Sequence, residues 1–340
     1  MGQKGLDRPF CPFSRTVRKP PRCGHGANVV SVDISPEDAY PRAIKRADGL
    51  GQARCRKRVH GEWRLAYAML VPASLVLLAV IFYPLVSTII GAFTGDAGFT
   101  LDNFRAVVNQ EAFGSVVWQS LIWTVGVVGI LTGVSMVLAL ALNEPFRGRG
   151  LARVVLLLPW ATPVAIAMMV WRYIFNEQYG HLNAVLRLLH LADRPVVWLG
   201  SPILGFGAIM AVEVWTAVPL MTLILMSGLQ TIPDELYDAA ALDGASGWKA
   251  FFHVTLPLLH PVLITGTLLF VIWTFNSFST IWIMTKGGPI HMTDTLVTYT
   301  YKVAFQYQLF NQAMALSVFI LIILLVFSLL YSTLYFRAES

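Results

Sequence analysis

The residues of this chain that could carry chemistry are a few polar side chains in an otherwise apolar body. Glu213 is the one acidic residue in a long apolar run between Pro195 and Pro233. A carboxylate in such a run is costly unless it faces an aqueous cavity or a partner, so Glu213 is a candidate cavity residue. The structural alternatives are an ion pair with Arg172, or a protonated carboxyl group bonded to a neighbouring helix.

A second polar segment, residues 232–257, has the pattern of two short helices joined by a glycine turn. The proline and two acids of Pro233–Glu235 predict a helix start, because proline suits the first turn and acids suit the positive end of the helix dipole. Gly244 is expected to end this helix. A second helix is predicted over Trp248–Val254, stopping at Pro257. A compact pair of short helices of this kind can bind in a cleft of another protein. The alternative is a helix at the membrane surface that has no partner.

The sequence lacks the patterns of nucleotide, metal or catalytic sites. It contains no G-x-x-x-x-G-K-[ST] loop, no Ser/His/Asp arrangement and no metal-spaced cluster within its apolar body. His253 and His260 flank a surface loop and are expected to have local roles. We therefore expect no catalytic residue and no metal site, and any energy source lies on a partner.

Composition places these residues in a membrane protein. Of 340 residues 56% are hydrophobic and 13% charged, with a mean hydropathy of +0.63, against about 25% charged in a soluble domain. Residues 1–64 carry a balance of +8, whereas residues 65–340 carry −2. The basic tail is expected to lie against anionic lipid on the cytoplasmic side, which excludes nucleic-acid binding.

All the cysteines lie in this tail. Cys11, Cys23 and Cys55 are expected to be free thiols in a disordered cytoplasmic segment. A zinc site with His25 and His60 is the alternative, although the spacing fits no ligand pattern.

Long uncharged stretches predict six membrane-spanning helices, since about 20 apolar residues cross the hydrocarbon core. The expected spans are 65–92, 116–142, 152–175, 203–228, 261–284 and 313–336. Basic residues flank the ends expected to be cytoplasmic: Arg54, Arg56, Lys57, Arg58, Arg64, Arg147, Arg149, Arg153 and Arg337. An even number of spans then puts both termini in the cytoplasm.

The 232–257 segment resembles a known family motif. Asp238-Ala239-Ala240, Gly244 and Val254-Thr-Leu256-Pro257 are similar to the EAA loop of bacterial ABC-importer permeases, with Asp for Glu and Val for Ile as the departures. Thr285-Lys-Gly287-Gly288-Pro289 and Leu158-Pro159-Trp160 further resemble carbohydrate-uptake permeases of the maltose and glycerol-3-phosphate type, the first of their two paired chains.

The resemblance implies an all-α membrane permease and its partners. It implies a basic tail over 1–62, a six-helix permease domain over 63–337 and a coupling loop at 230–258. The implied partners are a second homologous permease, a homodimeric ABC ATPase that binds ATP and Mg, a periplasmic or lipid-anchored substrate-binding protein, a sugar and membrane lipid. No cofactor is implied for this chain itself, which is a non-catalytic subunit in the bacterial inner membrane. The implied contacts to the ATPase are Asp238, Ala239, Ala240, Asp243, Gly244, Leu256 and Pro257.

The family's sugar-contact positions give an implied substrate pathway. They fall on Glu213, Thr216, Ala217, Leu220, Trp273, Thr274 and Ser277. Trp273 could stack on a sugar ring and the polar members could bond hydroxyl groups, while packing is the alternative for Trp273. Maltose permease has amides at the positions of Glu213 and Ser277 and an aromatic residue at that of Leu220, so the cavity differs from that protein's.

Other functions remain as alternatives. A glycerol-3-phosphate or glycerophosphodiester importer shares every motif, although the pathway positions include no basic residue. A secondary transporter predicts inverted repeats and paired intramembrane charges, and neither is present in the sequence. A membrane enzyme lacks a catalytic set, and a structural anchor does not need the coupling-loop spacing.

Overall fold

The computed structural model describes residues 67–95 and 98–339, with side chains through residue 333. The expected basic tail and its cysteines lie outside these residues. The chain divides into two compact units, 1–76 and 77–340. The helices and strands described below belong to the second unit. The exception is residues 67–76, which form the first part of the helix Tyr67–Ala92.

The described part is a bundle of apolar helices, which confirms the all-α membrane fold. Five helices are long and apolar enough to cross a membrane, and one bent pair makes a possible sixth. The five are Tyr67–Ala92, Glu111–Asn143, Pro202–Leu229, Trp248–Phe275 and Phe310–Thr333. The first contains the π-helical η1 (Leu78–Phe82) and α2 (Tyr83–Ala92), and the last belongs to α14 (Phe310–Glu339).

The expected third span over 152–175 is broken, which the sequence reading missed. It consists of α5 (Arg149–Ala161) and α6 (Val164–Ile174), bent by 93°. The break lies at Thr162 and Pro163, whose ψ angles are 130° and 125°. A residue before proline is pushed out of the helical region, and proline provides no backbone N–H, so the helix stops and restarts in a new direction.

The fifth span also differs from the prediction, which placed it over 261–284. The helix begins at Trp248 and runs through α10 (Trp248–Ala250), the π-helical η2 (Phe251–Thr255) and α11 (Leu256–Phe275). The expected stop at Pro257 is wrong: the Leu256 N–H donates to the Phe251 carbonyl in a wider π turn, and the helix continues through Pro257 into α11.

The same span ends earlier than expected, at Phe275. The side-chain amide of Asn276 donates to the Ile272 carbonyl at 2.8 Å and shares it with the Asn276 backbone N–H at 3.3 Å. The Ser277 N–H then donates to the Thr274 carbonyl at 3.0 Å, so the α-helical register ends there. A separate short helix, α12 (Ser279–Met284), follows.

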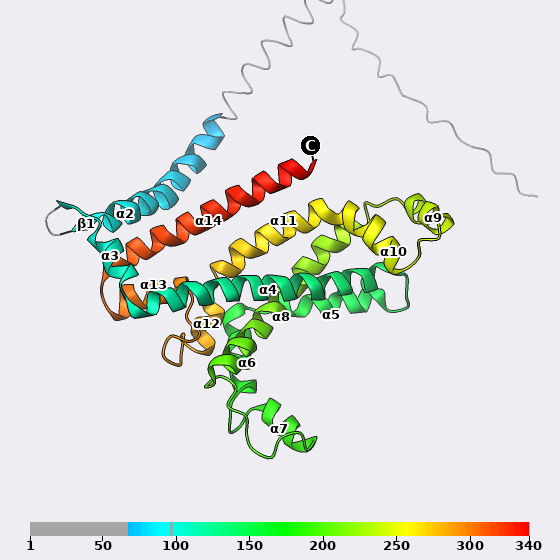
Figure 1. The fold of residues 1–340 in the computed structure, drawn as a ribbon, viewed down its shortest axis with the longest axis horizontal. Coiled ribbons are helices and arrows are strands. Elements are labelled where there is room, and N and C mark those ends of the chain that lie inside the picture. The colour runs from blue at the N-terminus through cyan, green and yellow to red at the C-terminus, as the bar shows by residue number, and fades with distance from the viewer. Residues whose placement is uncertain (1–66, 96–97, 340) are drawn as a thin grey trace, which may run out of the picture. The chain divides into compact units, whose positions relative to one another are not determined.

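The core lies between α4 (Glu111–Asn143) and α8 (Pro202–Leu229), which pack along their lengths (Figure 1). Trp123, Leu131 and Leu225 are fully buried there. The Trp123 indole N–H also donates to the Thr274 carbonyl at 2.9 Å, which ties α4 to the end of α11. A second apolar cluster joins α14 to α2 and to α3 (Asp102–Val108).

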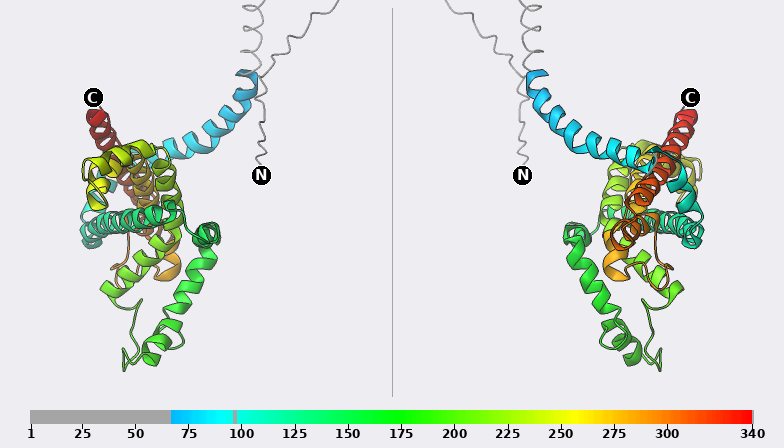
Figure 2. Two further views of the ribbon diagram at one scale, coloured as in Figure 1. Left: turned by 90° about the vertical axis from the view of Figure 1, so that its right-hand side faces the viewer. Right: turned by 90° about the vertical axis from the view of Figure 1, so that its left-hand side faces the viewer.

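Short elements gather at the two ends of α4 (Figure 1). One end carries β1 (Thr94–Gly95), β2 (Gly98–Phe99), α3, α12, α13 (Leu296–Tyr301) and η3 (Lys302–Gln306). The other end carries α9 (Asp234–Leu242) and α10. The two strands pair antiparallel, with Thr94 opposite Phe99. The segment around α7 (His181–Leu188) extends away from the other helices, as the further views confirm (Figure 2).

Candidate substrate pathway and coupling loop

A pocket of about 190 Å³ brings together most of the expected pathway residues. Its walls come from the α5–α6 break, α8 and α11. The lining residues are Pro159, Trp160, Thr162, Val164, Glu213, Thr216, Ala217, Leu220, Phe270, Trp273 and Thr274. Six of the seven expected residues are in this set, and Ser277 is not.

Helical spacing explains this convergence. On α8, Glu213, Thr216, Ala217 and Leu220 follow at intervals of three and four residues, which places them on one face. Trp273 lies in the last turn of α11, before Asn276, and lines the same pocket.

The Glu213 carboxylate is bonded within the helical framework. The Thr280 hydroxyl of α12 donates to its Oε2 at 2.5 Å, and the Ser277 side chain interacts with the same carboxyl group. The alternative pairing with Arg172 is not formed in the described structure, where the Arg172 guanidinium donates to the Ile283 carbonyl at 3.3 Å. Glu213 therefore combines a lining position with a bond to a neighbouring helix.

Two indoles open onto this pocket. Trp160 is 58% exposed and Trp273 is 52% exposed, and the Trp273 ring packs edge-on against Phe270 with centroids 5.6 Å apart. Large flat faces together with hydroxyls and a carboxylate form a surface that can bind a polyhydroxylated ring.

Sequence reasoning missed the contribution of the third span and of Thr280. Pro159 and Trp160 belong to a motif recognised in the sequence. The bend between α5 and α6, which the sequence did not indicate, places Trp160 and Thr162 in the wall of the pocket. Thr280 and Glu213 are 67 positions apart, and no periodicity links them.

The helix predicted to begin at Pro233 and to end at Gly244 is present as α9. It begins after Pro233 with Asp234 and Glu235 in the first turn. Its end is a Schellman motif: the Ala245 N–H donates to the Ala240 carbonyl at 2.8 Å, and the Gly244 N–H donates to that of Ala241 at 3.1 Å. Gly244 has a φ of +77°, a conformation that glycine adopts without a steric cost.

The α9 surface is exposed and partly apolar. Asp238, Ala239, Asp243 and Gly244 are exposed, whereas Ala240 is buried and faces the rest of the chain. Two apolar side chains accompany this surface: Leu242 is 90% exposed and Trp248 is 77% exposed.

A hollow of about 910 Å³ lies beside α9. Tyr237, Asp238 and Trp248 contribute to its wall, together with residues at the end of α4. The Tyr237 hydroxyl lies 3.1 Å from that of Thr255, which holds α9 against η2. Leu256 and Pro257 lie outside the hollow's lining, at the start of α11, so they are separated from the Asp238–Gly244 group by the η2 turn.

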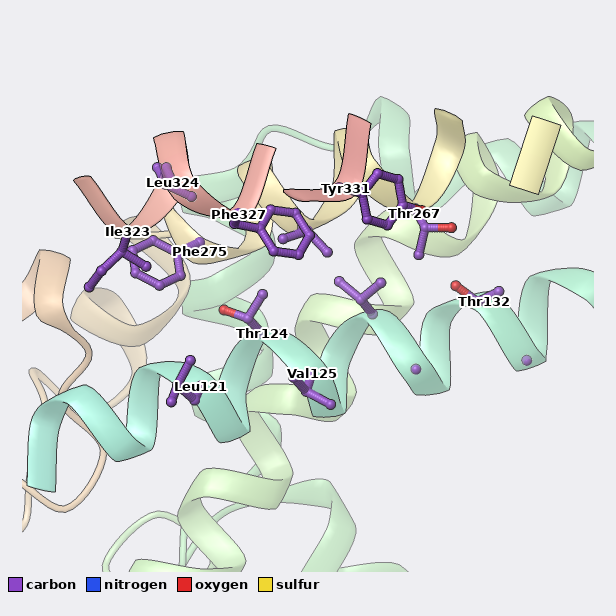
Figure 3. A pocket seen from close by; sticks show the side chains of 14 residues that line it. Leu121, Thr124, Val125, Thr132, Thr267, Phe275, Ile323, Leu324, Phe327 and Tyr331 are labelled. Carbon is purple, nitrogen blue, oxygen red and sulfur yellow. The ribbon is translucent and has the colours of Figure 1, made fainter. Parts of the chain in front are cut away.

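A third cavity, of about 510 Å³, differs from both in chemistry (Figure 3). It lies between α4, α11 and α14 and is lined mainly by aliphatic and aromatic side chains. The hydroxyls of Thr124, Thr267 and Tyr331 each donate to a backbone carbonyl. Thr132 also lines the cavity, and its buried hydroxyl has no hydrogen-bond partner among the described residues. The lining is therefore mainly apolar, with one unpaired hydroxyl.

Among the described residues, no group of three or more His, Cys, Asp or Glu side chains could hold a metal ion. An apolar helical bundle with five helices long enough to cross a membrane, and one bent pair besides, is the architecture of a multi-pass membrane protein.

The comparisons with known proteins identify the family. Residues 126–339 match the family described as "binding-protein-dependent transport system inner membrane component", and the chain belongs to it. It is thus a membrane-embedded, non-catalytic permease subunit of a transport system, and no cofactor is evident in this family.

Relatives and solved structures agree with this assignment. A probable ABC transporter permease protein of Brucella suis is 39% identical, over 81% of this chain and 98% of the relative. The trehalose/maltose transport system permease protein MalF of Thermococcus litoralis is 35% identical, over 81% and 95%. The diacetylchitobiose uptake system permease protein DasB of Streptomyces coelicolor is 32% identical, over 88% and 96%. A bacterial ABC transporter structure involved in import of the acidic polysaccharide alginate matches in fold, with a TM-score of 0.75 at 20% identity, over 84% of this chain and 100% of the other.

Proposed function

We propose that this chain forms half of the translocation pathway of an ATP-driven importer for a sugar, a disaccharide or a short oligosaccharide. The observation that carries the proposal is the pocket between α5, α8 and α11, which combines Trp160 and Trp273 with Glu213 and three threonines. Relatives named for trehalose/maltose and diacetylchitobiose transport support a sugar as cargo.

The charge of the pocket favours a neutral sugar over a phosphorylated polyol. Among the residues that the structure describes, the only titratable group lining the pocket is Glu213, and no Lys, Arg or His side chain lines it. A phosphate group would find no basic side chain there to pair with, whereas the hydroxyl groups of a neutral sugar need none. The glycerol-3-phosphate alternative is therefore disfavoured.

The ATPase contact in this proposal is the exposed face of α9. Asp238, Ala239, Asp243 and Gly244, with the apolar Leu242, would dock in a cleft of the ATPase, which binds ATP and Mg. Ala240, Leu256 and Pro257 would hold the loop on the bundle. Closure of the ATPase pair would then be transmitted through α9 and η2 to α11, which carries Trp273.

The orientation follows from this contact. With α9 in the cytoplasm, the end of α4 that carries α3 and α13 faces outward, and both termini are cytoplasmic. Residues 1–62 would be a basic cytoplasmic tail, 63–337 the permease domain and 230–258 its coupling loop. The second permease supplies the other half of the pathway, and a periplasmic or lipid-anchored binding protein delivers the sugar.

The test is uptake of labelled maltose, trehalose, chitobiose and glycerol-3-phosphate by cells carrying the complete transporter. Glu213→Gln keeps the shape of the side chain and removes its charge, and Glu177→Gln makes the same change at an exposed glutamate outside the pocket. The proposal expects uptake of at least one neutral sugar, altered by Glu213→Gln and unaffected by the control. Uptake of glycerol-3-phosphate alone would contradict it.

A further inference from the structure

The apolar cavity between α4, α11 and α14 is long and narrow, and it follows the direction of the helices (Figure 3). Its α4 wall extends from Leu121 to Gly133, which is about 18 Å of helix. The volume is about 510 Å³. Val125 in this wall is 71% exposed, so the cavity opens to the outside along its length. All three helices belong to candidate membrane spans, which places the opening at the depth of the bilayer.

Two glycines form the floor of the cavity. Gly129 and Gly133 lie one helical turn apart on α4, and a Cβ atom added to either would meet nothing within 4 Å. The space above both glycines is therefore vacant within this chain. Protein interiors are close-packed and leave few voids larger than a water molecule, so a void of this size requires an occupant from outside the chain.

The lining differs between the two ends of the cavity. Thr267 and Tyr331 lie at one end, where their hydroxyls donate to the carbonyls of Leu263 and Ile264. Leu121, Phe275 and Ile323 form the other end (Figure 3). An occupant thus meets apolar side chains over most of its length and polar groups at one end, which is the polarity of a lipid.

The depth of the polar end agrees with the ester groups of a phospholipid. Tyr331 lies six residues before Arg337, the next charged residue in the sequence, a distance of about 9 Å along α14. The headgroup region is about 5–7 Å thick on each side of the hydrocarbon core. Tyr331 is therefore close to the boundary of the hydrocarbon core, where tyrosine is enriched. From this boundary the cavity extends toward the middle of the bilayer.

The width of the cavity favours a hydrocarbon chain over a helix of another subunit. An α-helix with its side chains is at least about 10 Å wide, so an 18 Å length of it fills about 1,400 Å³. The cavity has little more than a third of that volume. A helix could cover the opening but could not enter it, whereas an extended acyl chain is thinner and can lie along the floor.

The cavity and the pathway pocket lie on opposite sides of α11. Val271 and Phe275 line the cavity, whereas Phe270 and Trp273 line the pocket. A chain in the cavity would therefore support the helix that carries Trp273.

We propose that this cavity binds one acyl chain of a membrane phospholipid, with the ester end beside Tyr331 and the methyl end beside Leu121. Filling the void provides the close contacts that α4, α11 and α14 do not make with one another. The site depends only on the cavity and the spans. Its assignment to the cytoplasmic leaflet rests on the proposed function, which places the end of α14 in the cytoplasm.

The test is photolabelling of the complete transporter in vesicles of phosphatidylethanolamine and phosphatidylglycerol. A trace of phosphatidylethanolamine carries a diazirine in its acyl chain, close to the ester in one probe and close to the terminal methyl group in the other. Mass spectrometry then locates the labelled residues. The expected result is labelling around Tyr331 by the first probe and around Leu121 and Ile323 by the second.

Leucine substitutions distinguish a bound chain from lipid that only surrounds the protein. Gly129→Leu and Gly133→Leu fill the cavity from its floor, and each should reduce labelling of the α14 wall by about fivefold or more. Gly114→Leu is the matched control: Gly114 is also on α4 with nothing within 4 Å of an added Cβ atom, but it does not line the cavity. This variant should be labelled like the wild type.

Three outcomes would contradict parts of the inference. Wild-type protein without label in the cavity, or equal labelling in Gly133→Leu, would overturn the lipid site. Loss of the second permease from Gly133→Leu but not from Gly114→Leu would assign the cavity to that subunit instead. Exchanged positions of the two probes would leave the site in place but refute the leaflet, and with it the orientation in the proposed function.

Discussion

Replacement of Gly244 by valine should uncouple transport while leaving the chain in the membrane. Gly244 adopts a φ of +77° at the end of α9, and a Cβ atom there would meet nothing within 4 Å. The change therefore causes no clash, and its cost is the left-handed backbone conformation, about 1–2 kcal/mol for a residue with a side chain. That cost lowers the equilibrium constant between the intact and the opened helix end by a factor of about 5 to 30.

The matched control is Gly148→Val. Gly148 has a φ of +93°, and a Cβ atom there also has open space around it, but it lies in the loop between α4 and α5. Both variants thus bear a similar conformational cost at different positions. Uptake and binding-protein-stimulated ATP hydrolysis would be measured per mole of complex in proteoliposomes. The expected result is a fivefold or greater loss of uptake for Gly244→Val only. Normal uptake in Gly244→Val, or an equal loss in Gly148→Val, would refute the role of α9.

Further substitutions test the pocket and the loop between α12 and α13. Trp273→Ala and Trp160→Ala should each weaken sugar binding by about three- to tenfold through lost stacking, measured by titration of the purified transporter; unchanged affinity in both would remove the stacking surface from the account. Thr280→Val should slow uptake because Glu213 loses the hydrogen bond from the Thr280 hydroxyl, a loss of about 1–3 kcal/mol. Thr280→Ser keeps a hydroxyl at this position and should leave uptake at the wild-type rate. Gly287→Ala should lower the melting temperature of the complex because its Cβ atom would overlap the Asp294 carboxylate, and an unchanged melting temperature would mean that this loop can relax.

The membrane architecture was predictable because hydrophobic length is a property of the sequence itself. Long apolar runs with at most one charge predicted the spans, and helix-start and glycine signals at Pro233 and Gly244 predicted α9 almost to the residue. The charge of a run of residues carries no information on the direction of the helix axis. A straight span and a bent one can therefore have the same composition. The break at Thr162 and Pro163 was therefore missed, although a residue before proline is a known boundary.

The pocket was predictable only in part. The resemblance to carbohydrate-uptake permeases supplied Glu213 and Trp273 as pathway positions, and helical spacing accounts only for the shared face of the α8 members. The bond from Thr280 to Glu213 depends on how α12 turns back after Asn276, and that turn is set by tertiary packing. The π turn before Pro257 was likewise invisible, because a wider hydrogen-bonding register has no simple residue pattern.

The central claim is tested most directly by gentle affinity purification of this chain from its own membranes, followed by mass spectrometry of the co-eluting proteins. The account predicts recovery of a second six-span permease and of an ATPase carrying a G-x-x-x-x-G-K-[ST] loop, in fixed ratio to this chain. Recovery of the chain alone, or only with further copies of itself, would contradict it.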